Sequence, residues 1–161
     1  MRIIYCHHAN RLKGNPPSQD DDITNIGKKD AKIVAKLFKE MNSSIIIKAI
    51  YSSEFFRCTK TANLINKYLN VPIIIDERLN EYRSNKGETW VNTQNRITSL
   101  LKEIIAKFED DECVICVTSG VNIAPFISLA YNIPNSEETP FLGVPSCCPI
   151  GFDYSKIMSN N

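Results

Sequence analysis

Two adjacent histidines, His7 and His8, have the clearest capacity for chemistry in this chain, which contains no other histidine. They follow an apolar run at residues 3–6 that predicts a buried strand, and a polar stretch at residues 10–22 comes next. Open α/β sheets bind their ligands at the carboxyl ends of their strands. This strand end is therefore the first candidate for an active site.

Three further residues follow segments that also predict strands, and their types suit a charged substrate. They are Arg57, Glu81 and Ser119. If the strands are parallel, their carboxyl ends lie at one edge of the sheet, so these side chains and His8 could converge there. A phosphoryl group carries concentrated negative charge, and a guanidinium group beside an imidazole and a carboxylate could offset that charge during transfer.

Several other kinds of site do not fit the sequence. Neither G-x-G-x-x-G nor G-x-x-x-x-G-K-[ST] occurs, which argues against a nucleotide-binding loop. A cysteine phosphatase needs a thiolate six residues before an arginine, whereas Cys6 precedes Arg11 by five residues. A zinc site at residues 6–8 is disfavoured because neighbours on a strand point apart, so no metal is expected.

Hydrophobic periodicity predicts the elements that must position these residues. Strands are expected at residues 3–7, 45–51, 71–75, 112–118 and 143–154, and helices after an N-cap at Thr24 and at residues 55–69, 90–108 and 121–131. This alternation predicts an α/β fold, a three-layer α/β/α sandwich around a mainly parallel central sheet. We expect one domain at residues 1–154 and a frayed tail at residues 155–161.

Composition limits the partners and the compartment. Nineteen basic and eighteen acidic residues give a formal charge of +1, which argues against nucleic acid as a partner. No apolar run approaches the ~20 residues of a membrane helix, so no membrane partner is expected. Cys113 and Cys116 have C-x-x-C spacing, but on a strand they would face opposite sides of the sheet as core thiols. Six cysteines without an export signal predict reduced thiols and a cytoplasmic protein.

Five short motifs occur in a characteristic order along nearly the whole chain. They are His7-His8-Ala9, Ile23-Thr24-x-x-Gly27, Ser52-Ser53-x-x-x-Arg57-x-x-x-Thr61-Ala62, Leu79-x-Glu81 with the later Gly87-Glu88-x-Trp90, and Thr118-Ser119-Gly120. In this combination the chain resembles the histidine phosphatase superfamily, the phosphoglycerate mutase-like proteins.

The resemblance implies a phosphohistidine mechanism that needs neither a metal nor another cofactor. His8 would attack phosphorus as a neutral imidazole, and Glu81 would protonate the leaving oxygen and later help to activate water. Arg57 would hold the non-bridging oxygens through its planar fork. The compact length favours hydrolysis of a phosphorylated small molecule or phosphoprotein over a mutase reaction, while the oligomeric state stays open.

The chain departs from the family pattern within the charged catalytic quartet. The arginine that usually precedes the nucleophile is His7, and the second histidine is Ser119. Asn10, where the family often has Glu or Gln, is a further candidate for substrate binding. If His7 must be protonated to bind phosphate, activity should rise as the pH falls toward its pKa. The departures allow a slow phosphatase or, alternatively, a catalytically impaired module that binds a phosphorylated ligand.

Overall fold

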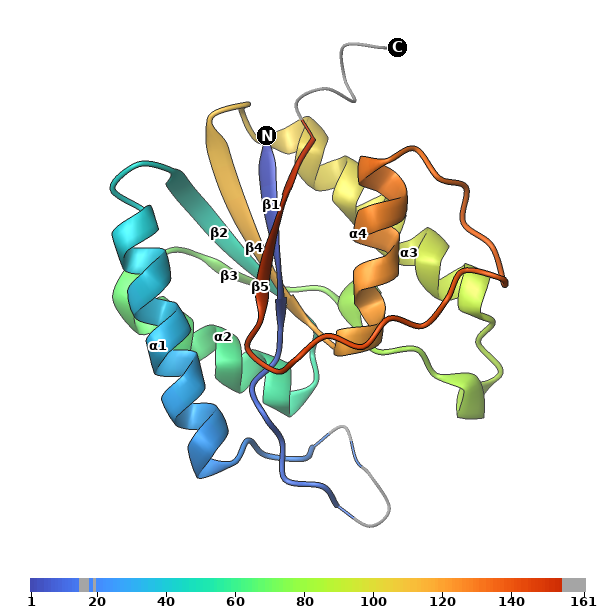
Figure 1. Ribbon diagram of the computed structural model, residues 1–161, viewed down its shortest axis with the longest axis horizontal. Helices are drawn as coiled ribbons and strands as arrows, with labels where there is room; N and C mark the ends of the chain where they lie inside the picture. Colours follow the sequence, from blue (N-terminus) through green and yellow to red (C-terminus); the bar gives the residue numbers. More distant parts are fainter. Residues whose placement is uncertain (15–17, 19, 155–161) are drawn as a thin grey trace.

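The computed structural model describes residues 1–14, 18 and 20–154, so the tail expected at residues 155–161 lies outside the described residues. Within them, a five-stranded sheet has the strand order β3-β2-β4-β1-β5 (Figure 1). Its strands are β1 (Arg2–His7), β2 (Ile46–Ser52), β3 (Ile73–Ile75), β4 (Glu112–Thr118) and β5 (Pro149–Asp153). The first four are parallel, and β5 runs antiparallel to β1.

Helices form a layer on each side of this sheet (Figure 1). One layer contains α1 (Asn25–Met41) and α2 (Phe56–Leu69), and the other contains α3 (Trp90–Lys107) and α4 (Ile123–Ala130). Short 3₁₀ turns occur at η1 (Glu77–Leu79), η2 (Ser84–Lys86) and η3 (Gly120–Asn122). The α/β fold with a mainly parallel central sheet is therefore confirmed. No described helix has the length and apolar character that a membrane crossing would require.

Alternation along the strands divides the interior into two cores. Ile4 packs with α1 and α2, whereas its neighbour Tyr5 packs with α3 and α4. The two cysteines of the C-x-x-C spacing separate in the same way, with Cys113 in the first core and Cys116 in the second. All six cysteines are free, and these two are buried, as the strand geometry predicts.

The start of α1 explains why a glycine lies near the first strand. Thr24 is the N-cap, and its hydroxyl accepts a hydrogen bond from the Gly27 amide at 2.9 Å. A Cβ atom at Gly27 would lie 2.5 Å from the carbonyl oxygen of Asn10. Only glycine therefore lets the chain after β1 pass this close to the helix.

The last strand differs from its sequence prediction in length. Residues 143–148 were expected to belong to a strand but form a loop, in which Cys147 has a positive φ of 57°. The Cys147 amide donates to the His7 carbonyl oxygen at 3.1 Å, and the Cys148 carbonyl oxygen accepts from the His7 amide at 3.4 Å. The loop thus continues the contact with the end of β1 without continuing the strand.

Candidate active site

Three of the predicted site residues form one hydrogen-bonded group at the carboxyl edge of the sheet. His8 follows β1, Arg57 lies in the first turn of α2 after β2, and Glu81 follows η1. The Arg57 Nε–H group donates to His8 Nε2 at 3.1 Å, and Arg57 Nη2 pairs with Glu81 Oε2. The strand ends therefore bring an imidazole, a guanidinium group and a carboxylate into direct contact.

His8 presents a neutral nitrogen to this group. Its Nδ1 atom lies 2.8 Å from the carbonyl oxygen of Ala9, which can only accept, so Nδ1 carries the proton and Nε2 keeps its lone pair. The side chain is 5% exposed, and burial, together with the neighbouring His7, lowers the pKa of His8 to about 3. A neutral imidazole with a fixed tautomer is the form that can act as a nucleophile.

Arg57 is held on several sides. Its Nη1 donates to the Ser18 carbonyl oxygen at 3.3 Å, and its guanidinium carbon lies 4.7 Å from the centre of the Phe55 ring. The Thr61 hydroxyl donates to the Arg57 carbonyl oxygen at 2.7 Å and accepts from the Ala9 amide at 2.9 Å. Thr61 therefore links the backbone beside His8 to the helical turn that carries Arg57.

The position of Glu81 is set through its backbone. Arg96 of α3 donates from Nη1 to the Arg78 carbonyl oxygen at 2.6 Å and from Nη2 to the Glu81 carbonyl oxygen at 3.5 Å. Asn122 donates to the carbonyl oxygens of residues 79–80 at 3.1 and 2.9 Å. These bonds fix the turn, while the Glu81 side chain remains 38% exposed toward the cavity.

His7 is held by the loop that precedes β5. Its Nδ1–H group donates to the Val144 carbonyl oxygen at 2.7 Å, and its ring centre lies 4.4 Å from that of His8. A Cβ atom at Gly120 would lie 2.9 Å from His7 Cε1, so the ring packs directly on this glycine. Burial is the main cause that lowers the pKa of His7 below 6.5. The expectation that protonation of His7 makes activity rise with falling pH therefore loses its basis near neutrality.

Among the described residues, no hydrogen bond joins the side chains of Ser119 and Asn10 to the group formed by His8 and Arg57. Ser119 is 2% exposed, and its hydroxyl has no hydrogen-bond partner among the described residues. Asn10 is exposed, and its Oδ1 atom accepts from the Thr24 hydroxyl at 3.2 Å. Their proposed roles in substrate binding remain predictions, and the geometry offers Ser119 as an unused donor or acceptor.

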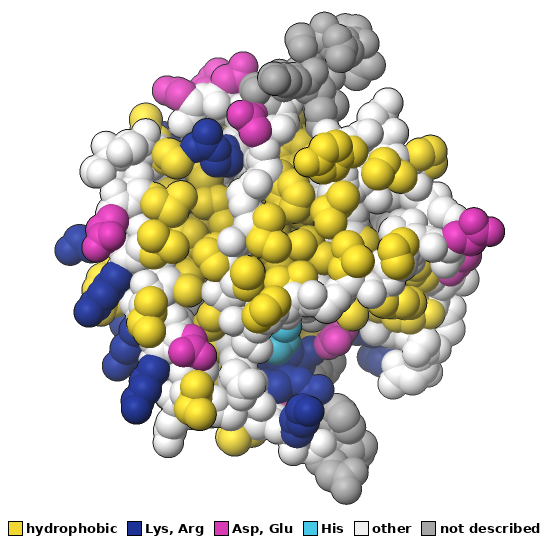
Figure 2. Space-filling view, in the orientation of Figure 1, with side chains coloured by type: hydrophobic (Ala, Val, Ile, Leu, Met, Phe, Trp, Pro, Cys, Tyr) yellow, Lys and Arg dark blue, Asp and Glu magenta, His cyan; other side chains and the backbone are white. Residues whose placement is uncertain are grey.

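A cavity of about 630 Å³ opens in front of this group. It is lined by Arg11, Ser18, Asp20, Phe55, Arg57, Glu81, Tyr82, Arg83, Asn85 and Lys86. In the space-filling view, histidine surface lies among basic and acidic side chains below the large apolar face (Figure 2). Sequence reasoning missed Arg11, Arg83 and Lys86, although the polar, basic run directly after Glu81 was a usable signal.

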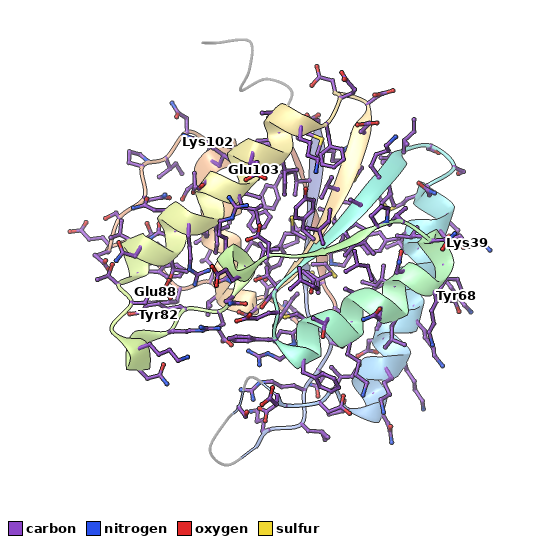
Figure 3. All side chains as sticks on the ribbon, turned by 180° about the vertical axis from the view of Figure 1, so that it is seen from behind. Lys39, Tyr68, Tyr82, Glu88, Lys102 and Glu103 are labelled. Carbon is purple, nitrogen blue, oxygen red and sulfur yellow. The ribbon has the colours of Figure 1, made fainter. Side chains whose placement is uncertain are left out.

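An aromatic cluster fixes the wall of this cavity. Tyr82 packs edge-on against Trp90 with ring centres 5.6 Å apart, and Trp90 stacks on Phe141 at 4.5 Å. The Trp90 indole also donates to the Thr139 carbonyl oxygen at 2.8 Å. Trp90 thus anchors a loop, as its buried position at the start of α3 implies. Figure 3 shows Tyr82 and Glu88 on the segment that leads into α3.

The comparisons with known proteins agree with this geometry. Residues 8–85 match the model of the histidine phosphatase superfamily (branch 1). The match covers 78 of the 161 residues and includes His8, Arg57 and Glu81. None of the curated proteins matches the sequence of this chain. Among the residues that the structure describes, no three His, Cys, Asp or Glu side chains are grouped so that they could hold a metal ion.

Solved structures of other proteins share the fold of this chain. YhfR of Bacillus stearothermophilus has a TM-score of 0.74 and 19% identity over 93% of this chain and 89% of that chain. A mycobacterial glucosyl-3-phosphoglycerate phosphatase, complexed with VO3, has a TM-score of 0.73 and 19% identity over 93% and 90%. The protein histidine phosphatase SixA, complexed with tungstate, has a TM-score of 0.70 and 11% identity over 94% and 86%.

Proposed function

We propose that this protein hydrolyses phosphomonoesters through a covalent intermediate on His8. The observation that carries the proposal is the neutral Nε2 of His8 in contact with the Arg57 guanidinium group. A bound phosphoryl group could replace His8 as the acceptor of the Arg57 N–H groups. It would then lie in front of the lone pair on His8 Nε2. The fold of phosphatases solved with vanadate and tungstate supports this assignment.

The reaction has two displacements at phosphorus. The lone pair of His8 Nε2 forms an N–P bond as the P–O bond to the alcohol breaks, and Glu81 gives a proton to the leaving oxygen. Glu81 then takes a proton from water, whose oxygen attacks phosphorus and breaks the N–P bond. Inorganic phosphate leaves, and His8 returns to its neutral state. Arg57 offsets the charge on the non-bridging oxygens in both steps.

A second function is favoured by the other two positions of the quartet. Neutral His7, bonded to Val144, and uncharged Ser119 supply no fixed cation beside the transferred group. The alternative is therefore a module that binds a phosphorylated small molecule or phosphoprotein without turnover. In either case we propose a reducing, cytoplasmic setting, which the six free thiols support.

One assay separates these functions. Phosphate release from p-nitrophenyl phosphate should be measurable with the wild type and absent with His8→Ala, while both proteins keep a cooperative thermal transition. Brief incubation with ³²P-labelled substrate should label the wild type with an acid-labile, alkali-stable phosphate. Equal turnover by both proteins would contradict the proposal. No turnover by the wild type, with tungstate still raising its Tm, would favour the binding module.

A further inference from the structure

Two of the basic side chains that line the cavity lie outside the hydrogen-bonded group of His8, Arg57 and Glu81. Arg83 and Lys86 belong to the segment around η2, directly after Glu81. The same two residues also line a neighbouring cavity of about 460 Å³. They therefore form a shared basic wall that any substrate bound at His8 would approach.

These cations keep unused hydrogen-bond donors, unlike Arg57. All three guanidinium nitrogens of Arg57 have acceptors, at His8, Ser18 and Glu81. Arg83 commits only its Nη2 atom, to Glu54 Oε1 at 3.0 Å, and its other side-chain nitrogens have no partner among the described residues. The exposed Lys86 likewise has no ion pair among the described residues. Free N–H donors that face a cavity are available to an anion.

Phe55 fixes how far this wall lies from the phosphate position. The guanidinium carbons of Arg57 and Arg83 lie 4.7 and 4.9 Å from the centre of the same Phe55 ring. Their separation cannot exceed the sum of these two distances. A compact molecule can therefore contact both guanidinium groups at once, with one anionic group at each.

We propose that Arg83 and Lys86 bind a second anionic group of the substrate, a carboxylate or a further phosphate a few bonds from the phosphate that His8 attacks. This inference rests on the proposed function and names its substrate class: small phosphomonoesters with two anionic groups. Asp20 and Glu81 also line the cavity and would repel a second anionic group, but four basic side chains in the same lining outnumber these two carboxylates.

The test compares the binding of 3-phosphonopropionate with that of propylphosphonate, which lacks the carboxylate. Both compounds are phosphonates, so neither can be hydrolysed. Calorimetry should give a Kd at least about tenfold lower for 3-phosphonopropionate, because two charge-assisted hydrogen bonds are added. In Arg83→Gln and in Lys86→Gln, the ratio of the two Kd values should fall about tenfold toward one. Arg83→Lys should restore part of the ratio, since it keeps the charge but not the fork.

Lys102→Gln is the matched control for Lys86→Gln, because Lys102 is an exposed lysine on α3 that does not line this cavity (Figure 3). It should leave the Kd ratio of the wild type unchanged. Equal affinity of the wild type for both phosphonates would overturn the inference while leaving the phosphate site intact. Failure of both phosphonates to bind would overturn the proposed phosphate site itself, and the inference with it.

Discussion

The two sides of the candidate site differ in the charge and the hydrogen bonding of their side chains. On the side of α2, Arg57 joins His8 and Glu81 in one hydrogen-bonded group with a permanent cation. On the side of β4 and the last loop, His7 is bonded to a backbone carbonyl, and the buried Ser119 hydroxyl has no hydrogen-bond partner among the described residues. The proposed nucleophile and acid are thus held by hydrogen bonds, whereas two of the positions expected to carry positive charge around a phosphate do not supply a fixed cation.

In this fold, the geometry of the proposed nucleophile and the positive charge around the phosphate can be separated. His8 owes its tautomer to the Ala9 carbonyl and its neutrality to burial, neither of which depends on a cation at position 7. The α2 side should therefore dominate the effects of mutation, and the other side should limit the rate. The following predictions test that division.

The largest effect should come from Arg57→Gln on the side of α2. It removes the guanidinium group that donates a hydrogen bond to His8, so kcat/KM for p-nitrophenyl phosphate should fall about a thousandfold. Arg57→Lys should recover only part of this loss, because a single ammonium cannot contact several oxygens as the fork does. A loss below tenfold for Arg57→Gln would show that the phosphate charge is offset elsewhere.

Glu81→Gln should reduce kcat/KM about a hundredfold with an alkyl phosphate, because the departing alkoxide then lacks its proton donor. The loss in kcat/KM should be much smaller with p-nitrophenyl phosphate, because its leaving group needs no proton and the later hydrolysis of the phosphoenzyme does not enter kcat/KM. Glu40→Gln, an exposed carboxylate on α1, is the matched control and should have no effect. Equal losses with both substrates would indicate that Glu81 acts by charge or position and not by proton transfer.

Substitutions that restore the missing positive charge test the side of β4 and the last loop. The double variant His7→Arg with Ser119→His should raise kcat/KM about tenfold or more, since it adds one permanent cation and one titratable donor. The KM should fall together with the rise in kcat if both side chains contact the phosphate. If stability is retained and no rate increase follows, positions 7 and 119 do not belong to the phosphate-binding set.

Acidification should destabilise the protein through both imidazoles. Burial lowers both histidine pKa values in the folded state, that of His8 to about 3, so the unfolded chain binds more protons below pH ~6.5. This stability is fully present above pH ~6.5 and is lost as the pH falls toward the folded-state values. Each group contributes up to about 1.4 kcal/mol per pH unit in that window.

Urea unfolding between pH 5 and pH 8 measures this slope, and His8→Gln should reduce it. An unchanged slope in the variant would mean that His8 is not buried in its neutral form. Because burial lowers the pKa of His7, any rise in activity that its protonation causes should come at a lower pH than for an exposed imidazole.

The side of α2 was well predicted from the sequence because it depends on patterns that are local in the sequence. His8, Arg57 and Glu81 each follow a strand with clear apolar periodicity, and parallel strands bring such ends together. The fate of His7 was not predictable in this way. Its partner Val144 lies in a loop that was expected to be a strand, and the path of that loop depends on contacts distant in sequence.

The basic wall was missed for a related reason. Arg83 and Lys86 belong to a polar run without a helical or strand period, so no pattern indicated which way their side chains would face. Their direction follows from tertiary packing, in which the neighbouring Tyr82 is held by Trp90 and Phe141.

Arg96 holds the turn before this wall through the backbone carbonyl groups of Arg78 and Glu81, and Asn122 holds the same turn through the carbonyl groups of residues 79–80. A carbonyl group is present whatever the side chain, so these anchors tolerate substitution in the residues that follow. Residues 82–86 can therefore vary while the backbone of Glu81, the proposed proton donor, stays in place. If the basic wall selects the substrate as proposed, mutation in this segment can change the substrate preference without a change in the proposed catalytic residues.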